Sequence, residues 1–419
     1  MKIGGGRTVA RTLGAGLLLL SLLAAAPGRA ATLHRLDGTS LTTSQIDAEV
    51  ARLMKERAVP GLAVALIEEG QPVFIKTYGL ANVEKKQPIE KETILYGASL
   101  TKLAFAYAVM QLVDEKVVDL DRSIAKDLPK PLPEYEKYAD LAGDERWQKL
   151  TPRILLDHTT GFPNFRFMNA NGKLDFKFEP GTRYAYSGEG YNLLQFVLEA
   201  GLGLNLGQEM QKRVFDRFGM KRTSMTWRED FAPNVADGYD EHGKREPHNE
   251  RGAVRAAGSM DTTIEDYAKF LAGFLRGEGI SAEARKEMLR PQIAIKSAHQ
   301  FPPLDPAENP ANAEIELSAG LGCVLFQSAA GPAFYKGGHN EWTDNLAIGL
   351  PDKKRGLLLM SNSVLAETIY PALVKFLWGE TRLPWSWEYN APELPPPVSM
   401  KASGNVLQAR EMVRCSQTL

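Results

Sequence analysis

The sequence has few of the residues that build metal sites, disulfide frameworks or nucleic-acid surfaces. Its 419 residues include 2 cysteines and 6 histidines, and no two histidines have the spacing of an HExxH motif. These counts provide no metal framework, so we expect neither a metal nor a cofactor. The formal net charge is -1, without the basic excess that nucleic-acid binding requires. We therefore expect a small or neutral substrate and no nucleic-acid partner.

The two cysteines lie in different surroundings. Cys323 lies in a strand-like apolar stretch, whereas Cys415 lies in a polar segment near the end of the chain. One disulfide is conceivable in an oxidising compartment. The contrast between an apolar and a polar environment favours two unpaired thiols, and the sequence leaves both alternatives open.

The N-terminus has the pattern of a signal peptide. Basic residues, beginning with Lys2 and Arg7, precede an apolar run at 13–26, and small residues follow it. The run is shorter than the roughly 20 apolar residues of a membrane span, which disfavours the alternative of an N-terminal anchor. We expect residues 1–31 to be removed and the protein to be exported, periplasmic or secreted, with no stable membrane span after cleavage.

Strand-like segments gather at both ends of the chain, and helical patterns fill the middle. Residues 61–79 contain two β-rich runs around Glu69-Gly70-Gln71, which predicts a hairpin. Near the other end, strand-like runs precede a helical pattern at roughly 366–379. These runs are 320–328, 332–338, 343–350 and 356–362.

This order predicts an α/β fold. One antiparallel sheet is formed from both chain ends and flanked by helices, and a mostly helical domain is inserted. Residues 386–419 are rich in proline and polar residues, and we expect them to form a poorly ordered tail. The predicted units are a signal peptide at 1–31, an α/β sheet domain at 32–98 plus 255–385, a helical domain at 99–254 and the tail at 386–419.

The tetrapeptide Ser-x-x-Lys occurs twice, and its spacing places both side chains on one face of a helix. The first copy, Ser99 to Lys102, opens the uninterrupted apolar pattern 99–115. The second copy, Ser123 to Lys126, follows a run of charged residues and is typical of a helix N-cap on a solvated surface. The first copy is therefore the better candidate for catalysis.

The first copy provides the parts of an activated nucleophile. A serine hydroxyl reacts poorly until a neighbouring base takes its proton. A lysine buried in an apolar helix beside a second cation has a lowered pKa, which suits Lys102 to that task. The backbone N–H of Ser99, at the helix N-terminus, would stabilise an oxyanion. On the tetrapeptide alone, a capping serine with a snorkelling lysine stays an equal alternative.

Further motifs favour catalysis. They read TPRILLDHTTGFP, FEPGTRYAYSGEGYNLL, GMKRTSM, AAGSMDTT and YKGGHNEWTDNLAIGLP, beginning at 151, 178, 219, 256 and 335. With Ser-x-x-Lys, they resemble the serine β-lactamase and penicillin-binding protein superfamily. The class C-like branch of that superfamily includes class C β-lactamases, D-alanyl-D-alanine carboxypeptidases and related esterases. The resemblance runs from about residue 45 to 380 and implies the β-lactamase/transpeptidase-like fold.

The resemblance assigns catalytic roles residue by residue. Ser99 is implied to be the nucleophile, and Lys102 its partner in the Ser-x-x-Lys motif. Tyr186 matches the tyrosine of the family's Tyr-x-Asn motif better than Tyr184 does. This tyrosine is implied to take the serine proton, with its pKa lowered by Lys102 and by a second lysine.

The third motif of the family is Lys-Thr-Gly or His-x-Gly on a strand. His339 looks at first like its head, but Pro351 lies fifteen residues after Lys336, which is the spacing that the resemblance requires. Lys336 is therefore the implied second lysine, followed by Gly337 and Gly338. His339 would then supply a backbone N–H as the second oxyanion donor, beside that of Ser99.

Two positions depart from the family pattern. Gly188 stands where the motif has an asparagine that contacts the substrate amide, and this puts efficient β-lactam turnover in doubt. Gly337 replaces a threonine or serine, which removes a hydroxyl that could bind a carboxylate. We expect Ser187 to compensate in part, and we place Ser187, Gly188, Gly337 and Gly338 in the substrate-binding surface.

These assignments predict an exported serine hydrolase. It would cleave an amide or ester bond of a β-lactam, a D-alanyl peptide or a small ester through an acyl-enzyme on Ser99. The alternative is a penicillin-binding or peptidoglycan-sensing protein that is acylated but turns over poorly. The substrate would be a small molecule or derived from peptidoglycan. The sequence leaves the physiological substrate and the oligomeric state open.

Overall fold

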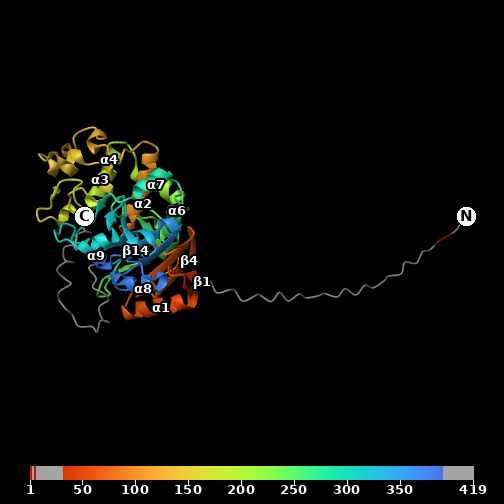
Figure 1. Ribbon diagram of the computed structural model, residues 1–419. Coiled ribbons are helices and arrows are strands. Elements are labelled where there is room, and N and C mark those ends of the chain that lie inside the picture. Colours follow the sequence, from red (N-terminus) through yellow and green to blue (C-terminus); the bar gives the residue numbers. More distant parts are fainter. Residues whose placement is uncertain (2–3, 6–31, 390–419) are drawn as a thin grey trace.

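A nine-stranded sheet forms the centre of the protein (Figure 1). The computed structural model describes residues 1, 4–5 and 32–389. Strand pairing is antiparallel throughout, in the order β10-β11-β12-β13-β14-β15-β3-β4-β5. The strands are β3 (Gly61–Glu68), β4 (Gln71–Asn82), β5 (Gln87–Pro88), β10 (Ile293–Ala294), β11 (Ser318–Ala319), β12 (Val324–Ser328), β13 (Gly331–His339), β14 (Asp344–Leu350) and β15 (Arg355–Ser361).

The pairing of β3 with β15 joins the two ends of the chain, as the sequence predicted. Leu62 lies opposite Ser361, and Ile67 lies opposite Gly356. The predicted hairpin is confirmed by the pairing of β3 with β4. Its two turn residues, Glu69 and Gly70, have φ values of 51° and 71°, which suit the right-handed twist of the flanking strands.

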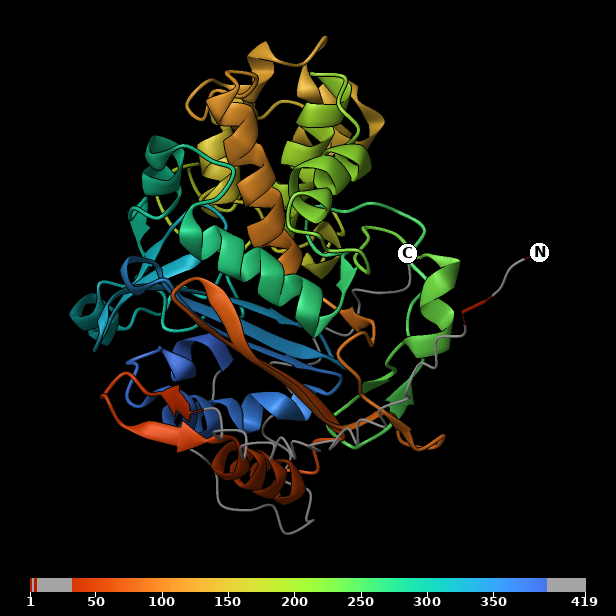
Figure 2. The ribbon, with the colours of Figure 1, turned by 90° about the vertical axis from the view of Figure 1, so that its right-hand side faces the viewer.

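Helices cover both faces of the sheet, and each face has its own apolar core. In Figure 2, α1 (Thr43–Glu56) and α8 (Tyr370–Trp378) lie below the sheet, and α6 (Ile264–Arg276) lies above it. Strand β3 alternates between the two cores: Ala63 and Ala65 face α6, whereas Leu62 and Val64 face α1. The sheet is therefore buried on both sides, which makes it a rigid support for a site at its edge.

Helix α2 (Leu100–Asp114) joins the sheet to the helical middle of the chain. Its residues from Leu100 to Leu112 are all buried, so the helix is enclosed on every side. It contacts β13 and β14 as well as α5 (Leu206–Met210) and α7 (Ala282–Met288). Because one apolar core runs through α2, α6 and the middle helices, the proposed division at 99 and 254 stays a prediction.

The remaining elements are short. The middle of the chain also contains α3 (Pro152–Leu156) and α4 (Gly188–Ala200), and the segment 129–150 contains three 3₁₀ turns. The small paired strands are β1 (Thr32–His34) with β2 (Ser40–Thr42), β6 (Leu95–Tyr96) with β9 (Asp261–Thr262), and β7 (Gly238–Tyr239) with β8 (Arg245–Glu246).

Two predictions near the C-terminus are corrected. The helix expected at 366–379 begins later, as α8, after a 3₁₀ turn at Val364–Thr368. The tail expected from 386 begins too early, because residues 386–389 belong to helix α9 (Trp385–Tyr389). The side chains of Trp387 and Glu388 are buried. Burial of the aromatic residues of this segment outweighs its proline-rich surroundings.

Several predictions fall on residues that the structure does not describe. The signal peptide at 1–31 lies outside the described residues apart from positions 1, 4 and 5, and so does the tail from 390 to 419. Cys323 is buried and forms no disulfide with another described residue, and Cys415 lies outside the described residues. Within the part of the chain that is described, no helix is long and apolar enough to cross a membrane.

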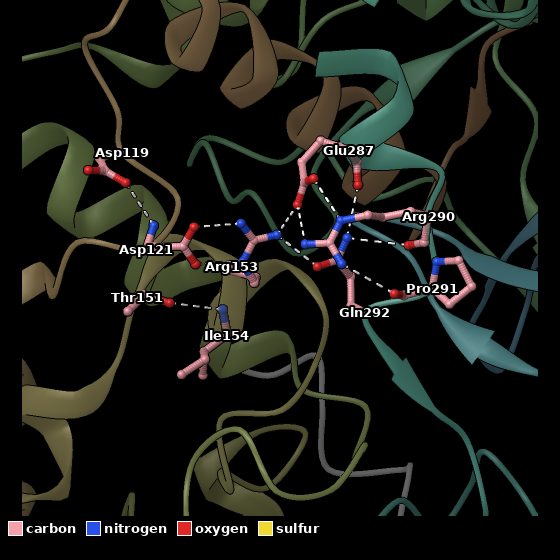
Figure 3. A network of polar contacts seen from close by, with 9 residues as sticks. All are labelled: Asp119, Asp121, Thr151, Arg153, Ile154, Glu287, Arg290, Pro291 and Gln292. Carbon is pink, nitrogen blue, oxygen red and sulfur yellow. Dashed lines mark hydrogen bonds and ion pairs between the residues drawn. The ribbon is translucent and has the colours of Figure 1, made fainter. Parts of the chain in front are cut away.

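A polar network ties the middle of the chain to the sheet domain (Figure 3). Arg153, at the start of α3, donates to both carboxylate oxygens of Asp121, at 2.7 and 2.6 Å. The same guanidinium donates to Glu287 on α7 and, at 2.8 Å, to Gln292 beside β10. Arg153 therefore links three segments that lie far apart in the sequence.

Replacing Arg153 with methionine is expected to lower the melting temperature by about 2–4 °C, because the partly buried Glu287 and Gln292 lose a charge-assisted donor. Arg290 and Arg153 together lower the pKa of Glu287 from 4.5 to about 2. Stabilisation by a carboxylate with a lowered pKa is lost as the pH falls. The difference between variant and wild type should therefore shrink between pH 4.5 and 2.

Thermal melting followed by circular dichroism checks this expectation, with Arg122→Met as the control. Arg122 is half exposed and pairs at 3.3 Å with Asp127 at the surface, so its removal should change little. Equal melting temperatures for the wild type and Arg153→Met at pH 7 would show that the network does not hold the two parts together.

Candidate active site

Ser99 stands at the beginning of α2, immediately after a strained residue. Ala98 has a φ of 45°, a backbone conformation that residues other than glycine rarely adopt. The preceding segment is held in place by the pairing of β6 with β9 and by the bond from Gly97 N–H to Met260 O. The Ser99 hydroxyl makes no capping hydrogen bond to its helix. Helix capping therefore does not account for this serine.

The second Ser-x-x-Lys copy behaves as predicted for a structural serine. The Ser123 hydroxyl accepts a hydrogen bond from Ala125 N–H at 3.2 Å and caps a 3₁₀ turn, Ile124–Lys126. The same tetrapeptide thus has two different environments. In the first copy, the serine hydroxyl contacts the lysine of its own motif, whereas the Ser123 hydroxyl contacts backbone groups.

Lys102 contacts Ser99 from inside the apolar helix. Its Nζ lies 3.1 Å from Ser99 Oγ and 2.5 Å from Ala257 O, and the residue is 1% exposed. The ring centroids of Tyr186 and Tyr191 lie 4.9 and 5.5 Å from Nζ. Burial, together with the charge of Lys336, holds the pKa of Lys102 well below its ordinary value. A neutral amine at this position can accept a proton.

Tyr186 and Lys336 complete the group. Lys336 Nζ donates to the Tyr186 hydroxyl at 3.4 Å and to Gly337 O at 2.7 Å. Burial lowers the pKa of Lys336 to about 8, although Glu388 opposes that shift. The expected lowering of the Tyr186 pKa is wrong: burial raises it, and a hydrogen bond with Ser99 offsets this only in part. The Tyr186 hydroxyl is therefore protonated at neutral pH.

His158 packs against the ring of Tyr186, and the sequence analysis did not name it as a site residue. Its ring stacks on that of Tyr186 with centroids 4.3 Å apart, and its Nδ1 accepts from Ser187 N–H at 3.0 Å. Burial and the two lysines lower the pKa of His158, which keeps the ring neutral. The signal was present in the motif TPRILLDHTTGFP, whose histidine fixes the position of the tyrosine rather than binding a metal.

The glycine at 338 lets strand β13 approach the nucleophile. A Cβ there would lie 2.8 Å from Leu100 N and 2.9 Å from Gly97 O, which leaves no room for a side chain. Strand β13 ends at His339, which lines the same cavity as Ser99. The expected oxyanion donors, the backbone N–H groups of Ser99 and His339, thus belong to two elements in close contact.

The predicted substrate-binding role of Ser187 finds no support in its contacts. The hydroxyl is fully buried, donates to Pro163 O at 2.9 Å and accepts from Gly190 N–H at 3.1 Å, which caps α4. At Gly188, a Cβ would meet the Phe165 ring at 2.5 Å and Asn164 Oδ1 at 3.2 Å. The space of the family's asparagine is therefore filled by the loop before α4, which the sequence analysis did not identify.

The glycine at 337 is explained by a residue from the C-terminal helix. A Cβ on Gly337 would overlap Oε1 of Glu388, whose side chain reaches from α9 to β13. Burial raises the pKa of Glu388 above its ordinary value, and the charge of Lys336 offsets this only in part. Glu388 lay in the segment expected to be a tail, so sequence reasoning gave no signal for it.

These residues line one cavity of about 620 Å³. Ser99, Lys102, Tyr186 and Lys336 share it with Asn164, Phe165 and Glu388. Within the described residues, no group of three or more histidine, cysteine, aspartate or glutamate side chains could hold a metal ion. The cavity is large enough for a small substrate beside the nucleophile.

The fold and these residues define a class of protein. A large antiparallel sheet with helices on both faces is the fold of β-lactamases and penicillin-binding proteins. The family model described as Beta-lactamase matches residues 46–371. The chain belongs to this family.

Individual relatives are distant. The chain is 26% identical to the unguisins hydrolase ungD of Aspergillus violaceofuscus, over 58% of this chain and 47% of that protein. It is 23% identical to a D-aminopeptidase of Gluconobacter oxydans, over 47% and 38%. The chain thus spans less than half the length of these two relatives. The octameric penicillin-binding protein homologue from Pyrococcus abyssi has the same fold, with a TM-score of 0.65, 23% identity and coverage of 81% and 78%.

Proposed function

We propose that the protein is an exported serine hydrolase that cleaves an amide or ester bond through an acyl-enzyme on Ser99. The observation that carries the proposal is the 3.1 Å contact between Lys102 Nζ and Ser99 Oγ, on a helix buried on every side. The family relatives named a hydrolase and a D-aminopeptidase support hydrolysis of an acyl bond. Export rests on the signal-peptide pattern of residues 1–31, which favours a periplasmic or secreted protein.

Acylation begins with Lys102 as the base. Because its pKa is lowered by burial, the neutral amine takes the Ser99 proton while Oγ bonds to the carbonyl carbon of the substrate. The charge that develops on the carbonyl oxygen is stabilised by the backbone N–H groups of Ser99 and His339. The bond to the leaving group then breaks, and the proton held by Lys102 passes to it, directly or through the Tyr186 hydroxyl.

Tyr186 acts as a proton carrier rather than as an anionic base. Its raised pKa keeps the hydroxyl protonated, and this hydroxyl lies between Ser99 and the donating ammonium of Lys336. In deacylation, the neutral Lys102 removes a proton from water, and the water oxygen attacks the ester carbon. The bond between that carbon and Ser99 Oγ then breaks, Oγ receives the proton held by Lys102, and the acid product leaves.

A penicillin-binding protein that is acylated but releases product slowly is a second candidate. The observation that favours it is the filling of the space at Gly188 by Phe165 and Asn164. A side chain at position 188 would require the Phe165 ring to move. A site that lacks its contact with the substrate amide can be acylated and yet discharge poorly.

A panel of three acyl substrates separates these functions. We expect turnover of p-nitrophenyl acetate by the wild type and none by Ser99→Ala. Rapid hydrolysis of nitrocefin would identify a β-lactamase, and a stable adduct with a fluorescent penicillin would identify the slow binding protein. Absence of turnover and of adduct with all three substrates would contradict the proposed hydrolase.

A further inference from the structure

Glu388, a residue of the active-site cavity wall, has a buried carboxylate oxygen that accepts no hydrogen bond from the described residues. The residue is 3% exposed and lines the cavity that contains Ser99. Its Oε2 accepts from Gln300 Nε2 at 2.6 Å and from the Tyr335 hydroxyl at 3.2 Å. Among the described residues, no hydrogen bond reaches Oε1, and the nearest cationic candidate, His339 Nε2, lies 3.8 Å away.

The chain makes room for this oxygen at the strand that carries Lys336. Gly337 has no side chain, and any Cβ there would overlap Oε1. The carboxylate therefore lies directly against β13. A buried carboxylate oxygen without a donor is costly, and a ligand that supplies a donor removes that cost.

We propose that Glu388 Oε1 binds a primary ammonium group of the substrate, so that the enzyme selects amine-bearing amides or esters over carboxylate-bearing ones. The inference rests on the proposed hydrolase function and names its substrate class. An ammonium at Oε1 forms a charge-assisted hydrogen bond in a site shielded from water, which is the strongest contact that this oxygen can make. Penicillins and peptides with a free C-terminal carboxylate meet repulsion at the same position.

Binding of three matched ligands tests the subsite without depending on turnover. Benzylamine, benzyl alcohol and benzoate share one ring and differ in the charge of the attached group. By calorimetry on the full chain at pH 7, we expect the wild type to bind benzylamine at least about tenfold more tightly than benzoate, with the alcohol between them. Equal affinities, or tighter binding of benzoate, would overturn the proposal with the wild type alone.

The variant Glu388→Gln tests the residue itself. It keeps the shape of the side chain, so the benzylamine-to-benzoate affinity ratio should fall to less than about threefold. The control Glu241→Gln removes a charge from the same lining and should keep the wild-type ratio. A ratio that survives Glu388→Gln would assign the ammonium to another group.

Hydrolysis of p-nitrophenyl acetate, measured on the same samples, separates the two proposals. This neutral ester needs Ser99 and no ammonium subsite. Hydrolysis without amine selectivity would reject the subsite and leave the hydrolase, whereas amine selectivity without any hydrolysis would reject the hydrolase and leave a cation-binding cavity.

Discussion

The variant Ser99→Ala is expected to lose at least about 1,000-fold in kcat/KM with every acyl substrate that the wild type accepts. The acyl-enzyme needs the Oγ atom, which lies 3.1 Å from the amine of the buried Lys102. Steady-state assays with p-nitrophenyl acetate measure the loss. Binding of ligands in the cavity should persist, because alanine removes one atom and leaves the walls unchanged.

The second Ser-x-x-Lys motif provides the matched control. Ser123 has the same tetrapeptide but caps a 3₁₀ turn far from the cavity lining, so Ser123→Ala should retain the wild-type kcat/KM. This variant should instead lower the free energy of unfolding by about 1 kcal/mol, because the 3₁₀ turn loses its cap. Full activity in Ser99→Ala, or a comparable loss in Ser123→Ala, would show that the nucleophile is wrongly assigned.

The variant Lys102→Met is expected to lose about 100- to 10,000-fold in kcat/KM, the usual contribution of a general base. Methionine fits the apolar helix, so the loss reflects the missing amine rather than a collapsed site. Lys126→Met, in the second motif, should leave the rate unchanged. A melting temperature close to that of the wild type, measured on the same preparation, verifies the fold.

The pH dependence of kcat/KM follows from the same two lysines. The rate should rise as Lys102 loses its proton, at a pKa well below its ordinary 10.5. It should fall again above about 8, as Lys336 loses the charge that polarises Tyr186. In Lys336→Met the alkaline fall should disappear, and the acid limb should move to higher pH, because Lys336 no longer lowers the pKa of Lys102.

An acid limb that stays in place in Lys336→Met would contradict the coupling of the two lysines. An acid limb that persists unchanged in Lys102→Met would assign the base to another residue. The profile therefore distinguishes Lys102 from Tyr186, which the sequence left as alternative proton acceptors.

Local patterns with few alternatives were predictable from the sequence. The run 99–115 has no glycine or proline and forms α2, and the turn at Glu69-Gly70 fixes the β3–β4 hairpin. Lys336 was selected by its distance from Pro351, and its Nζ lies 3.4 Å from the Tyr186 hydroxyl. In each case the signal lay in neighbouring residues or in a fixed spacing along one strand pair.

Contacts between segments far apart in the sequence were not predictable. Glu388 reaches Gly337 from a helix in a segment that looked like a tail, and Phe165 with Asn164 fills the space at Gly188. The pKa of Tyr186 depends on burial, which one sequence does not reveal. The sequence shows that positions 188 and 337 are glycines, whereas the fold shows which residues occupy the space beside them.

The mass of the peptide that contains Ser99 tests the acyl-enzyme most directly. The wild type is mixed with p-nitrophenyl acetate, quenched in acid during turnover and digested. We expect the mass of one acetyl group on Ser99, absent from Ser99→Ala and reduced in Lys102→Met. An unmodified Ser99 in protein that is turning over the ester, or an acetyl group on another residue at full occupancy, would contradict catalysis through Ser99.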